Sequence, residues 1–353
     1  MPLIRAKEPK IPFNPPHHVI RKTKLPYTGE PDGIIDKPFW DQAEDIGFLH
    51  DIEGDHMPAP LKKTVIKMLW DENNLYVGAK LYDDEIWSYV KNRDEVVYMD
   101  NDFEIFLAPM ETSHRYYEIE TNASGTVWDL LMEKPFRDGV HRIVSWDVAG
   151  LKYGCHVEGE LNNAAADNKY WSVEFIIPFF SLRECGIDIC RPTHITPDVG
   201  EMWRCNFSRV EYKVDVIDNK FYKRKDEDGN FLPEFNWVWA PTGIIDIHMP
   251  EMWGYIVFGD DETEFKAPED EKEIMQLRKL YYRLRTFGAE KGYYTTNLND
   301  LVAEGEISID AKIYATPNMF EIIMPDKLTG GTVHLRHDGF MWRQKYENEV
   351  YEP

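Results

Sequence analysis

The sequence has few basic residues for its acidity, few cysteines and no long hydrophobic run. Lys and Arg number 40 against 63 Asp and Glu among 353 residues, which gives a formal net charge of −23. Nucleic acids and anionic membranes bind basic surfaces, so this charge argues against both as partners. No apolar stretch reaches the length of a membrane span. The charge fits a neutral ligand, a cation or simply high solubility.

The four cysteines do not form a zinc motif. Cys155, Cys185, Cys190 and Cys205 lack the paired CxxC spacing of zinc ligands. Cys155 and Cys205 fall in predicted strands, where we expect free thiols of the core. A GxSxG nucleophile elbow, a HExxH motif and a phosphate-binding glycine loop are also missing, so the sequence gives no support to those enzyme classes.

The first residues have no leader-like pattern. MPLIRAKEPKIPFNPPHHVIRK carries positive charge but has no apolar central segment and no small-residue cleavage site, so we expect no signal peptide. The protein is then either cytoplasmic, or extracellular or periplasmic after removal of a leader. Residues 1–30 are rich in Pro and Lys and predict an extended N-terminal arm.

Short alternating segments separated by turns dominate the chain from Gly33 onward. The sequence holds 11 Trp, 19 Tyr and 18 Phe, and aromatic residues favour strands. The segments are TVIKMLW, LYVGAKLYD, DNDFEIFLAP, YYEIETN, TVWDLLME, YGCHVEGEL, YWSVEFIIP, MWRCNFSRVE and WGYIVF. No helix of convincing length lies between them. Residues 31–260 are therefore predicted to be mainly β, an antiparallel β-sandwich of jelly-roll or immunoglobulin-like kind.

An acidic linker, DDETEFKAPEDEKE, separates these segments from the one predicted helix. Apolar residues recur there at helical spacing: Ile274, Leu277, Tyr281, Leu284 and Phe287. The later segments ISIDAKIYA, MFEIIMP and TVHLRHDGFMWRQ predict two or three strands. Residues 261–353 thus form a small C-terminal α+β appendix, and the apolar stripe of its helix must cover its own strands or the sandwich.

Acidic residues alternate along two neighbouring strand segments, DNDFEIFLAP and YYEIETN. Asp102 and Glu104 share one side of the first segment, and Glu118, Glu120 and Asn122 share one side of the second. We expect Glu104 and Glu120 on one sheet face. Carboxylates in register repel one another, so the pKa of at least one should be raised unless a basic side chain or a bound cation is in contact.

Several segments together resemble the family 9-like carbohydrate-binding modules, and they follow the order of the family. They are GIIDKPFW, LWDENNLYVGAKLYD, DNDFEIFLAP with YYEIETN, YWSVEFIIP, WRCNFSRVE and NWVWAPTGIIDIHMPEMWGYIVF. The resemblance spans about Pro31 to Gly259 and implies a DOMON-like β-sandwich with a sugar site on one face. It also implies a secreted protein of polysaccharide catabolism, with glycan-degrading enzymes as partners.

The resemblance also marks differences in the sugar site. Family members clamp a sugar between two tryptophans; Tyr98 takes the place of the first, and the second falls near Ile247. Glu104 matches the ligand-binding carboxylate of the family, whereas Glu118 replaces an arginine. These changes indicate a divergent, larger member, and the sequence identifies neither its sugar nor the linkage.

A sugar site needs flat aromatic faces and planar polar groups that bind paired hydroxyls. We expect Trp237 and Trp239, in the loop-like stretch NWVWAPTG, to stack on the ligand, and Arg209 and His248 to close the site. The predicted ligand-binding residues are Tyr98, Glu104, Glu118, Glu120, Asn122, Trp128, Asp129, Arg209, Trp237, Trp239 and His248, and none is predicted to be catalytic. The structural alternative is a solvated face at Glu104 and Glu120 with Trp128 in the core.

Three functions remain open from the sequence. The first, which we favour on the resemblance, is non-catalytic binding of a glycan or oligosaccharide. The second is a glycoside hydrolase-like enzyme that uses Glu104, Glu120 and Asp129 as its acid and base. The third is an interaction protein whose sugar site has decayed, which agrees with the missing second tryptophan.

Two acidic turns are candidates for structural calcium. Asp83 and Asp84 stand together in one turn and Asp100 and Asp102 in the other, and calcium prefers such hard oxygen ligands. Neither turn has EF-hand spacing, and solvated acidic turns are the commoner explanation. Family members can carry structural calcium, but the predicted binding requires no cofactor.

Overall fold

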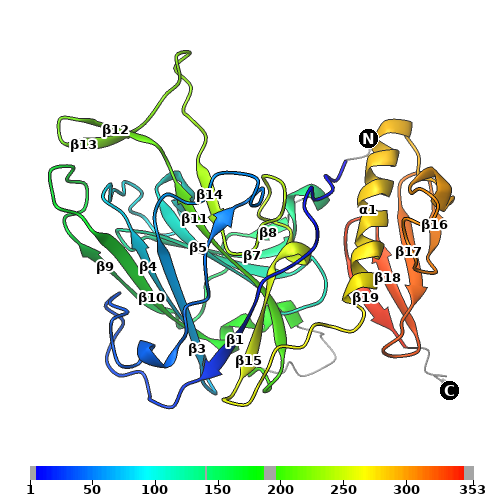
Figure 1. The fold of residues 1–353 in the computed structure, drawn as a ribbon, viewed down its shortest axis with the longest axis horizontal. Helices are drawn as coiled ribbons and strands as arrows, with labels where there is room; N and C mark the ends of the chain where they lie inside the picture. Colours follow the sequence, from blue (N-terminus) through cyan, green and yellow to red (C-terminus); the bar gives the residue numbers. More distant parts are fainter. Residues whose placement is uncertain (1–4, 140, 187–195, 346–353) are drawn as a thin grey trace.

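A large curled sheet dominates the computed structural model, which describes residues 5–139, 141–186 and 196–345 (Figure 1). The sheet has 13 strands in the order β8-β7-β6-β5-β11-β15-β1-β3-β4-β10-β9, with β14 beside β11 and β2 beside β14. Its strands are β1 (His17–Lys22), β2 (His50–Asp51), β3 (Thr64–Trp70), β4 (Asn74–Tyr82), β5 (Asp102–Ala108), β6 (Tyr116–Asn122), β7 (Val127–Lys134), β8 (His141–Ile143), β9 (Lys152–Glu158), β10 (Tyr170–Pro178), β11 (Met202–Glu211), β14 (Phe235–Val238) and β15 (Gly254–Gly259).

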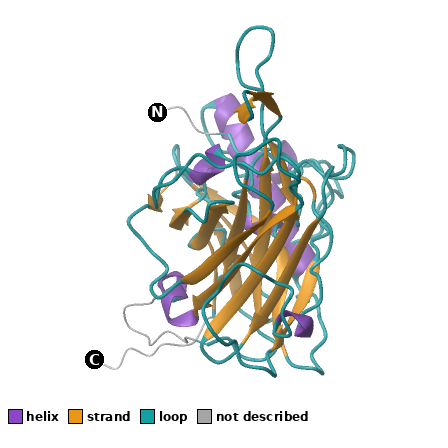
Figure 2. Cartoon of the chain, turned by 90° about the vertical axis from the view of Figure 1, so that its left-hand side faces the viewer, coloured by secondary structure: helices purple, strands orange, loops and turns teal. Residues whose placement is uncertain are grey.

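The curl of the sheet brings its two halves face to face around one core. Ile105 on β5 and Phe207 on β11 belong to the same buried cluster as Val77 on β4 and Phe175 on β10. Figure 2 shows the long strands running side by side, with loops at both ends. The alternating segments form strands because every second side chain enters this core. The prediction of a mainly β sandwich is confirmed.

The N-terminal arm takes part in the sheet. β1 pairs in parallel with both β15 and β3, whereas the other strand pairs are antiparallel. Ile20 on β1 is fully buried in the sandwich core. The sheet therefore begins before Pro31, where the sequence pattern places the start of the sandwich.

Short elements connect these strands. A separate hairpin is formed by β12 (Val214–Ile217) and β13 (Lys220–Lys223). The 3-10 helices are η1 (Trp40–Gln42), η2 (Val97–Met99), η3 (Phe136–Asp138), η4 (Phe179–Leu182), η5 (Glu184–Gly186), η6 (Pro250–Met252) and η7 (Leu298–Asp300). Two of these 3-10 helices take part in the contacts described below. The first, η2, lies beside β6, and the second, η6, lies next to the C-terminal appendix.

The C-terminal appendix is one helix on a four-stranded antiparallel sheet. The helix is α1 (Glu271–Lys291), and the strands, in sheet order, are β16 (Lys312–Ala315), β17 (Phe320–Pro325), β18 (Thr332–Arg336) and β19 (Met341–Gln344). Gly292 ends the helix with φ of 79°, a left-handed conformation that glycine adopts without strain. Among the described residues, no helix is long and apolar enough to cross a bilayer.

The helix packs on both sides. α1 lies between the four-stranded sheet and the sandwich (Figure 1), and Leu277, Tyr281 and Leu284 are fully buried. Their cluster includes residues of the small sheet, such as Ile322, and residues of the sandwich, such as Met252. The predicted apolar stripe therefore has its cover, from its own strands and from the sandwich together.

Candidate functional site

The acidic face is the outer side of the half-sheet formed by β11, β5, β6 and β7. Cross-strand pairing places Ser208, Glu104, Glu120 and Trp128 in one row across these four strands. Glu104 and Glu120 are direct neighbours on β5 and β6, which confirms that they share one face. We call Asp102, Glu104, Glu118 and Glu120 the acidic cluster; their exposed fractions are 0%, 6%, 5% and 1%.

Segment η2 covers one end of this row. The backbone N–H of Tyr98 donates to Oε2 of Glu120 at 3.1 Å. The Tyr98 ring stacks on Trp128 with centroids 6.4 Å apart and an interplanar angle of 28°. Trp128 is buried, but 42% of Tyr98 remains exposed. An accessible aromatic ring thus lies beside the acidic cluster.

His248 lies on the same face, over the next row. Its ring meets the edge of Phe106 at a centroid distance of 5.9 Å, and its Nδ1 is 2.8 Å from the hydroxyl of Tyr116. Phe106 pairs across the strands with Glu118. Burial, aided by the charges of Arg137 and Arg142, lowers the pKa of His248 to about 3, so this ring is neutral at ordinary pH.

Burial raises the pKa of every member of the acidic cluster. The pKa of Glu104 rises to about 7 and that of Glu118 to about 8, and those of Asp102 and Glu120 rise well above their usual range. For all but Glu104, the charge of a neighbouring cluster carboxylate is the second cause. The cluster therefore holds protons near neutral pH unless a cation replaces them.

We expect this proton uptake to make stability depend on pH. The unfolded Glu118 has a pKa near 4.5 and the folded one near 8. Stability from this group is fully present below pH 4.5 and is lost as the pH rises through 8. A Glu118→Gln variant stays neutral. The free energy of unfolding of this variant, minus that of the unmodified protein, should therefore increase by about 1–2 kcal/mol as the pH is raised from about 5 to about 8.

Urea denaturation in EDTA at several pH values measures this difference. Glu44→Gln serves as the control, because Glu44 is exposed to solvent. A difference between Glu118→Gln and the original protein that stays constant over this range would show that Glu118 is charged throughout.

Two predicted members of the sugar site lie on the opposite side of their strands. Arg209 points into the sandwich, is 1% exposed and donates to Asp83, Glu211 and the carbonyl oxygen of Tyr82. Asp129 is fully buried, pairs with Arg93 and accepts the N–H of Val148 at 2.7 Å. The prediction that these two residues join Glu104 and Glu120 is wrong, because adjacent residues of a strand face opposite ways.

The prediction of two exposed stacking tryptophans is also wrong. Trp237 and Trp239 are 2% and 3% exposed and belong to the sandwich core. Trp237 lies on β14, which pairs with β11, and its indole N–H donates to Oε2 of Glu211 at 2.5 Å. Pairing with β11 turns this loop-like segment into a strand and buries its side chains.

The candidate calcium ligands do not come together as the sequence pattern suggests. Asp83 and Asp84 both pair with Lys62. One carboxylate oxygen of Asp100 accepts four hydrogen bonds, among them one from the side-chain amide of Asn122 at 3.1 Å. Asn122 is fully buried and supports this turn. Of the four residues, Asp102 alone belongs to a possible metal-binding group in the described chain.

Sequence reasoning missed two charged residues near the face. The charge of Arg142, on β8, lowers the pKa of Glu118, and the charge of Glu234 raises that of Glu104. Arg142 lies in a strand of three residues and Glu234 in a loop, so no periodic pattern marks either residue.

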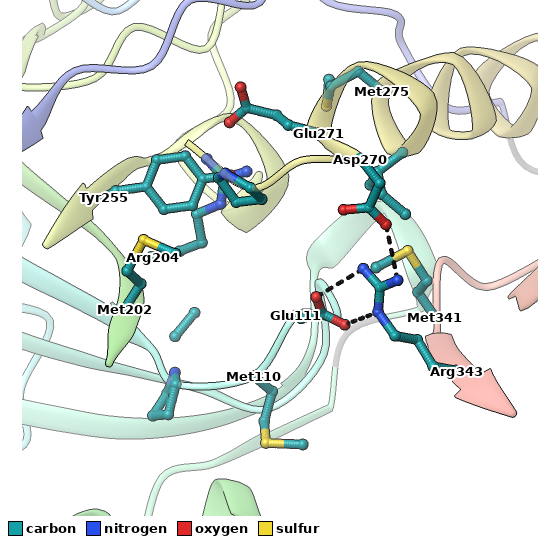
Figure 3. Close-up of a pocket in the computed structure, with 14 residues that line it drawn as sticks. Met110, Glu111, Met202, Arg204, Tyr255, Asp270, Glu271, Met275, Met341 and Arg343 are labelled. Atoms are coloured by element: carbon teal, nitrogen blue, oxygen red, sulfur yellow. Dashed lines mark hydrogen bonds and ion pairs between the residues drawn. The ribbon is translucent and has the colours of Figure 1, made fainter. Parts of the chain in front are cut away.

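A separate pocket of about 150 Å³ lies between the sandwich and the appendix (Figure 3). Arg204 lies against the ring of Tyr255, with 3.6 Å from the guanidinium carbon to the ring centroid. Arg343 pairs with Glu111 and Asp270, each at 2.8 Å. Four methionines are also among the 14 residues that line the pocket: Met110, Met202, Met275 and Met341. The sequence gives no sign of this pocket because both parts of the chain build it.

The fold and the face together define a β-sandwich with an acidic and aromatic surface. Residues 32–182 match the family model for the carbohydrate family 9 binding domain-like proteins. This segment contains β5, β6 and β7, and so the whole acidic cluster. The match confirms the family resemblance of this part of the chain, and it supports carbohydrate binding as the class of function.

Several solved structures resemble the chain, among them the following three. A candidate carbohydrate-binding protein of Bacteroides uniformis is 14% identical, with a TM-score of 0.47 over 69% of this chain and 98% of that one. A family 9 carbohydrate-binding module of Caldicellulosiruptor kristjanssonii with cellotriose is 15% identical, with a TM-score of 0.40 over 71% and 98%. Its counterpart with glucose is 14% identical, with a TM-score of 0.39 over 71% and 100%. A comparison with curated proteins found no match.

Proposed function

We propose that the chain is a non-catalytic carbohydrate-binding protein, which holds a glycan or oligosaccharide against the outer face of β5 to β7. The observation that carries the proposal is the exposed Tyr98 ring, stacked on Trp128 beside Glu104 and Glu120. The family match over residues 32–182 supports sugar as the ligand class.

The chemistry of the face suits a sugar. The flat ring of Tyr98 can lie against the C–H side of a pyranose. Glu104 and Glu118 can hydrogen bond to its hydroxyls, which both donate and accept. Because burial raises the pKa of both carboxyls to about 7 and about 8, each can donate as well as accept near neutral pH.

The same geometry disfavours the hydrolase alternative. The acid and base of a glycosidase flank the bond that they cleave. Glu104 and Glu120 instead lie side by side on adjacent strands and are buried, and Asp129 lies on the other side of its strand. Binding without cleavage fits this arrangement better.

The wider setting is also a proposal that rests on the family resemblance. We propose that binding serves polysaccharide breakdown outside the cytoplasm, next to glycan-degrading enzymes. Detection of the protein in a cell-surface or extracellular fraction, together with such an enzyme, would test this setting. A purely cytoplasmic location would contradict it.

We expect Glu104→Ala to weaken carbohydrate binding and to leave the fold intact. Loss of a hydrogen bond to a charged or polarised carboxyl costs about 1.5–3 kcal/mol, which is about 10- to 150-fold in Kd. Tyr98→Ala should weaken binding as well, through loss of its stacking surface. A glycan array finds the ligand, and calorimetry with that ligand measures the change.

Tyr314→Ala is the matched control for Tyr98→Ala. Tyr314 is 56% exposed but lies on β16 of the appendix, so its removal should leave affinity unchanged. Unchanged binding in both Tyr98→Ala and Glu104→Ala would place the sugar site elsewhere on the molecule. Release of shorter products from the bound glycan would support the hydrolase instead.

A further inference from the structure

Three buried carboxylates meet on the acidic face without a visible counter-charge. Asp102 and Glu104 on β5 and Glu120 on β6 each offer an oxygen within 4.8 Å of the other two. The Asp102 side chain is fully buried, and its oxygens have no hydrogen-bond partner of normal distance and angle among the described residues; the backbone N–H of Val210 is only near enough to offset part of the pKa rise that burial causes. An unsatisfied buried acceptor costs about 1–3 kcal/mol, so a partner for these oxygens is expected.

A second group of three carboxylates, which includes Asp129 on β7, does have a basic partner. Its members are Asp94, Asp129 and Asp147, at similar spacing. There Arg93 supplies the positive charge, because its Nη2 contacts Asp129 and lies 2.6 Å from Asp147. The three carboxylates on the acidic face have no such residue, since no described Lys, Arg or His forms an ion pair with them.

The nearest basic groups stay at the margin of the face. The charge of Arg142 acts on Glu118, which is outside the group of three. The charges of Asp100 and Asp102 act on Lys223, but its Nζ contacts the ring of Tyr212, 3.5 Å from the ring centroid, and forms no ion pair with either carboxylate. Arg209, which the sequence pattern places here, serves the opposite side of the sheet. No basic side chain of the described residues therefore forms an ion pair with the group of three, and a bound cation would supply that counter-charge.

We propose that Asp102, Glu104 and Glu120 bind a divalent cation, for which calcium is the best match. All three ligands are hard carboxylate oxygens, without the Cys or His that zinc prefers. Carboxylate oxygens that lie within 4.8 Å of one another can share one calcium ion, whose bonds to oxygen are about 2.3–2.6 Å long. Magnesium needs a tighter and more regular octahedron.

The cation would act on the face as a whole. It would offset the charge of the three carboxylates and would fix Glu104 and Glu120 in one arrangement on adjacent strands. The site is distinct from the predicted acidic turns at Asp83, Asp84 and Asp100, which protein donors already occupy. Glu104 belongs both to this group and to the proposed sugar site, so the cation site shares that carboxylate with the proposed function, whereas Tyr98 belongs to the sugar site alone.

Calorimetry with calcium alone on the EDTA-treated full chain tests the proposal. We expect one calcium per chain, a rise in the thermal unfolding temperature on adding calcium, and weaker binding of magnesium. Asp102→Asn should weaken calcium binding by at least about tenfold. Asp147→Asn, in the group that Arg93 already neutralises, should leave calcium affinity unchanged.

The variants separate this site from the sugar site. Tyr98→Ala should retain full calcium binding whatever it does to sugar affinity. If Asp102→Asn fails to fold by circular dichroism, Glu120→Gln takes its place. The proposal is overturned if calcium gives neither heat nor a shift in unfolding temperature, or if Asp147→Asn loses calcium while Asp102→Asn keeps it. Tighter binding of magnesium than of calcium would overturn the choice of ion.

Discussion

Glu174→Ala is expected to destabilise the fold by about 3–5 kcal/mol, the cost of removing one partner from a buried charged network. Glu174 stands in the middle of β10 and its side chain is fully buried. One carboxylate oxygen accepts hydrogen bonds from the indole N–H of Trp40 at 2.7 Å and from the hydroxyl of Tyr27 at 3.1 Å. The other accepts the N–H of Gly33 at 2.9 Å and pairs with Lys37 at 2.8 Å.

These contacts attach the segment from Tyr27 to Gln42 to the outer face of β4 and β10. Trp40 and Phe39 pack there with Tyr76 and Ile176 in a small separate core. Without Glu174, the buried Trp40 N–H loses its acceptor and Lys37 keeps only Asp32 of its described ion-pair partners, so the segment should detach before the rest unfolds.

Urea denaturation gives the free energy, and hydrogen exchange over residues 27–42 gives the local effect. Glu174→Gln keeps one acceptor but loses the charge, so it should fall between the alanine variant and the original protein. The exposed Glu44→Ala provides the control and should change the free energy by less than about 0.5 kcal/mol. A loss in Glu174→Ala as small as that of the control would contradict the anchoring role.

Glu251→Ala should release the appendix from the sandwich, at a cost of about 3–5 kcal/mol. Glu251 lies in η6, and its carboxylate accepts two hydrogen bonds from Arg137 at 2.8 and 2.9 Å. The hydroxyl of Tyr282, on α1, donates to the same carboxylate. Burial alone would raise the pKa of Glu251, but the charges of Arg137 and Arg278 hold it below its ordinary value.

Removal of this carboxylate leaves a buried guanidinium and a buried hydroxyl without their acceptor. We expect faster proteolysis of the linker between β15 and α1, and a lower unfolding temperature. Glu269→Ala is the matched control, because Glu269 is exposed in the same linker. Equal proteolysis rates in the two variants would show that apolar packing alone holds α1 in place.

The sequence by itself determined the periodic features. Alternation along DNDFEIFLAP and YYEIETN was sufficient to place Glu104 and Glu120 on one face, because a strand turns successive side chains to opposite sides. The spacing of Leu277, Tyr281 and Leu284 was sufficient for a helix with one buried stripe. Both inferences depend on local geometry, which neighbouring residues alone decide.

The tertiary structure alone decided which buried polar side chains become hydrogen-bond or ion-pair partners. Arg209 is buried because Tyr82 and Asp83, far away in the chain, supply its acceptors, and Trp237 is buried because β14 adds to β11. The sequence pattern groups Asp102 with Asp100 in one acidic turn, yet local donors satisfy Asp100, while Asp102 faces Glu104 and Glu120. Such pairings form when distant segments close on one another, and residue spacing holds no record of that closure.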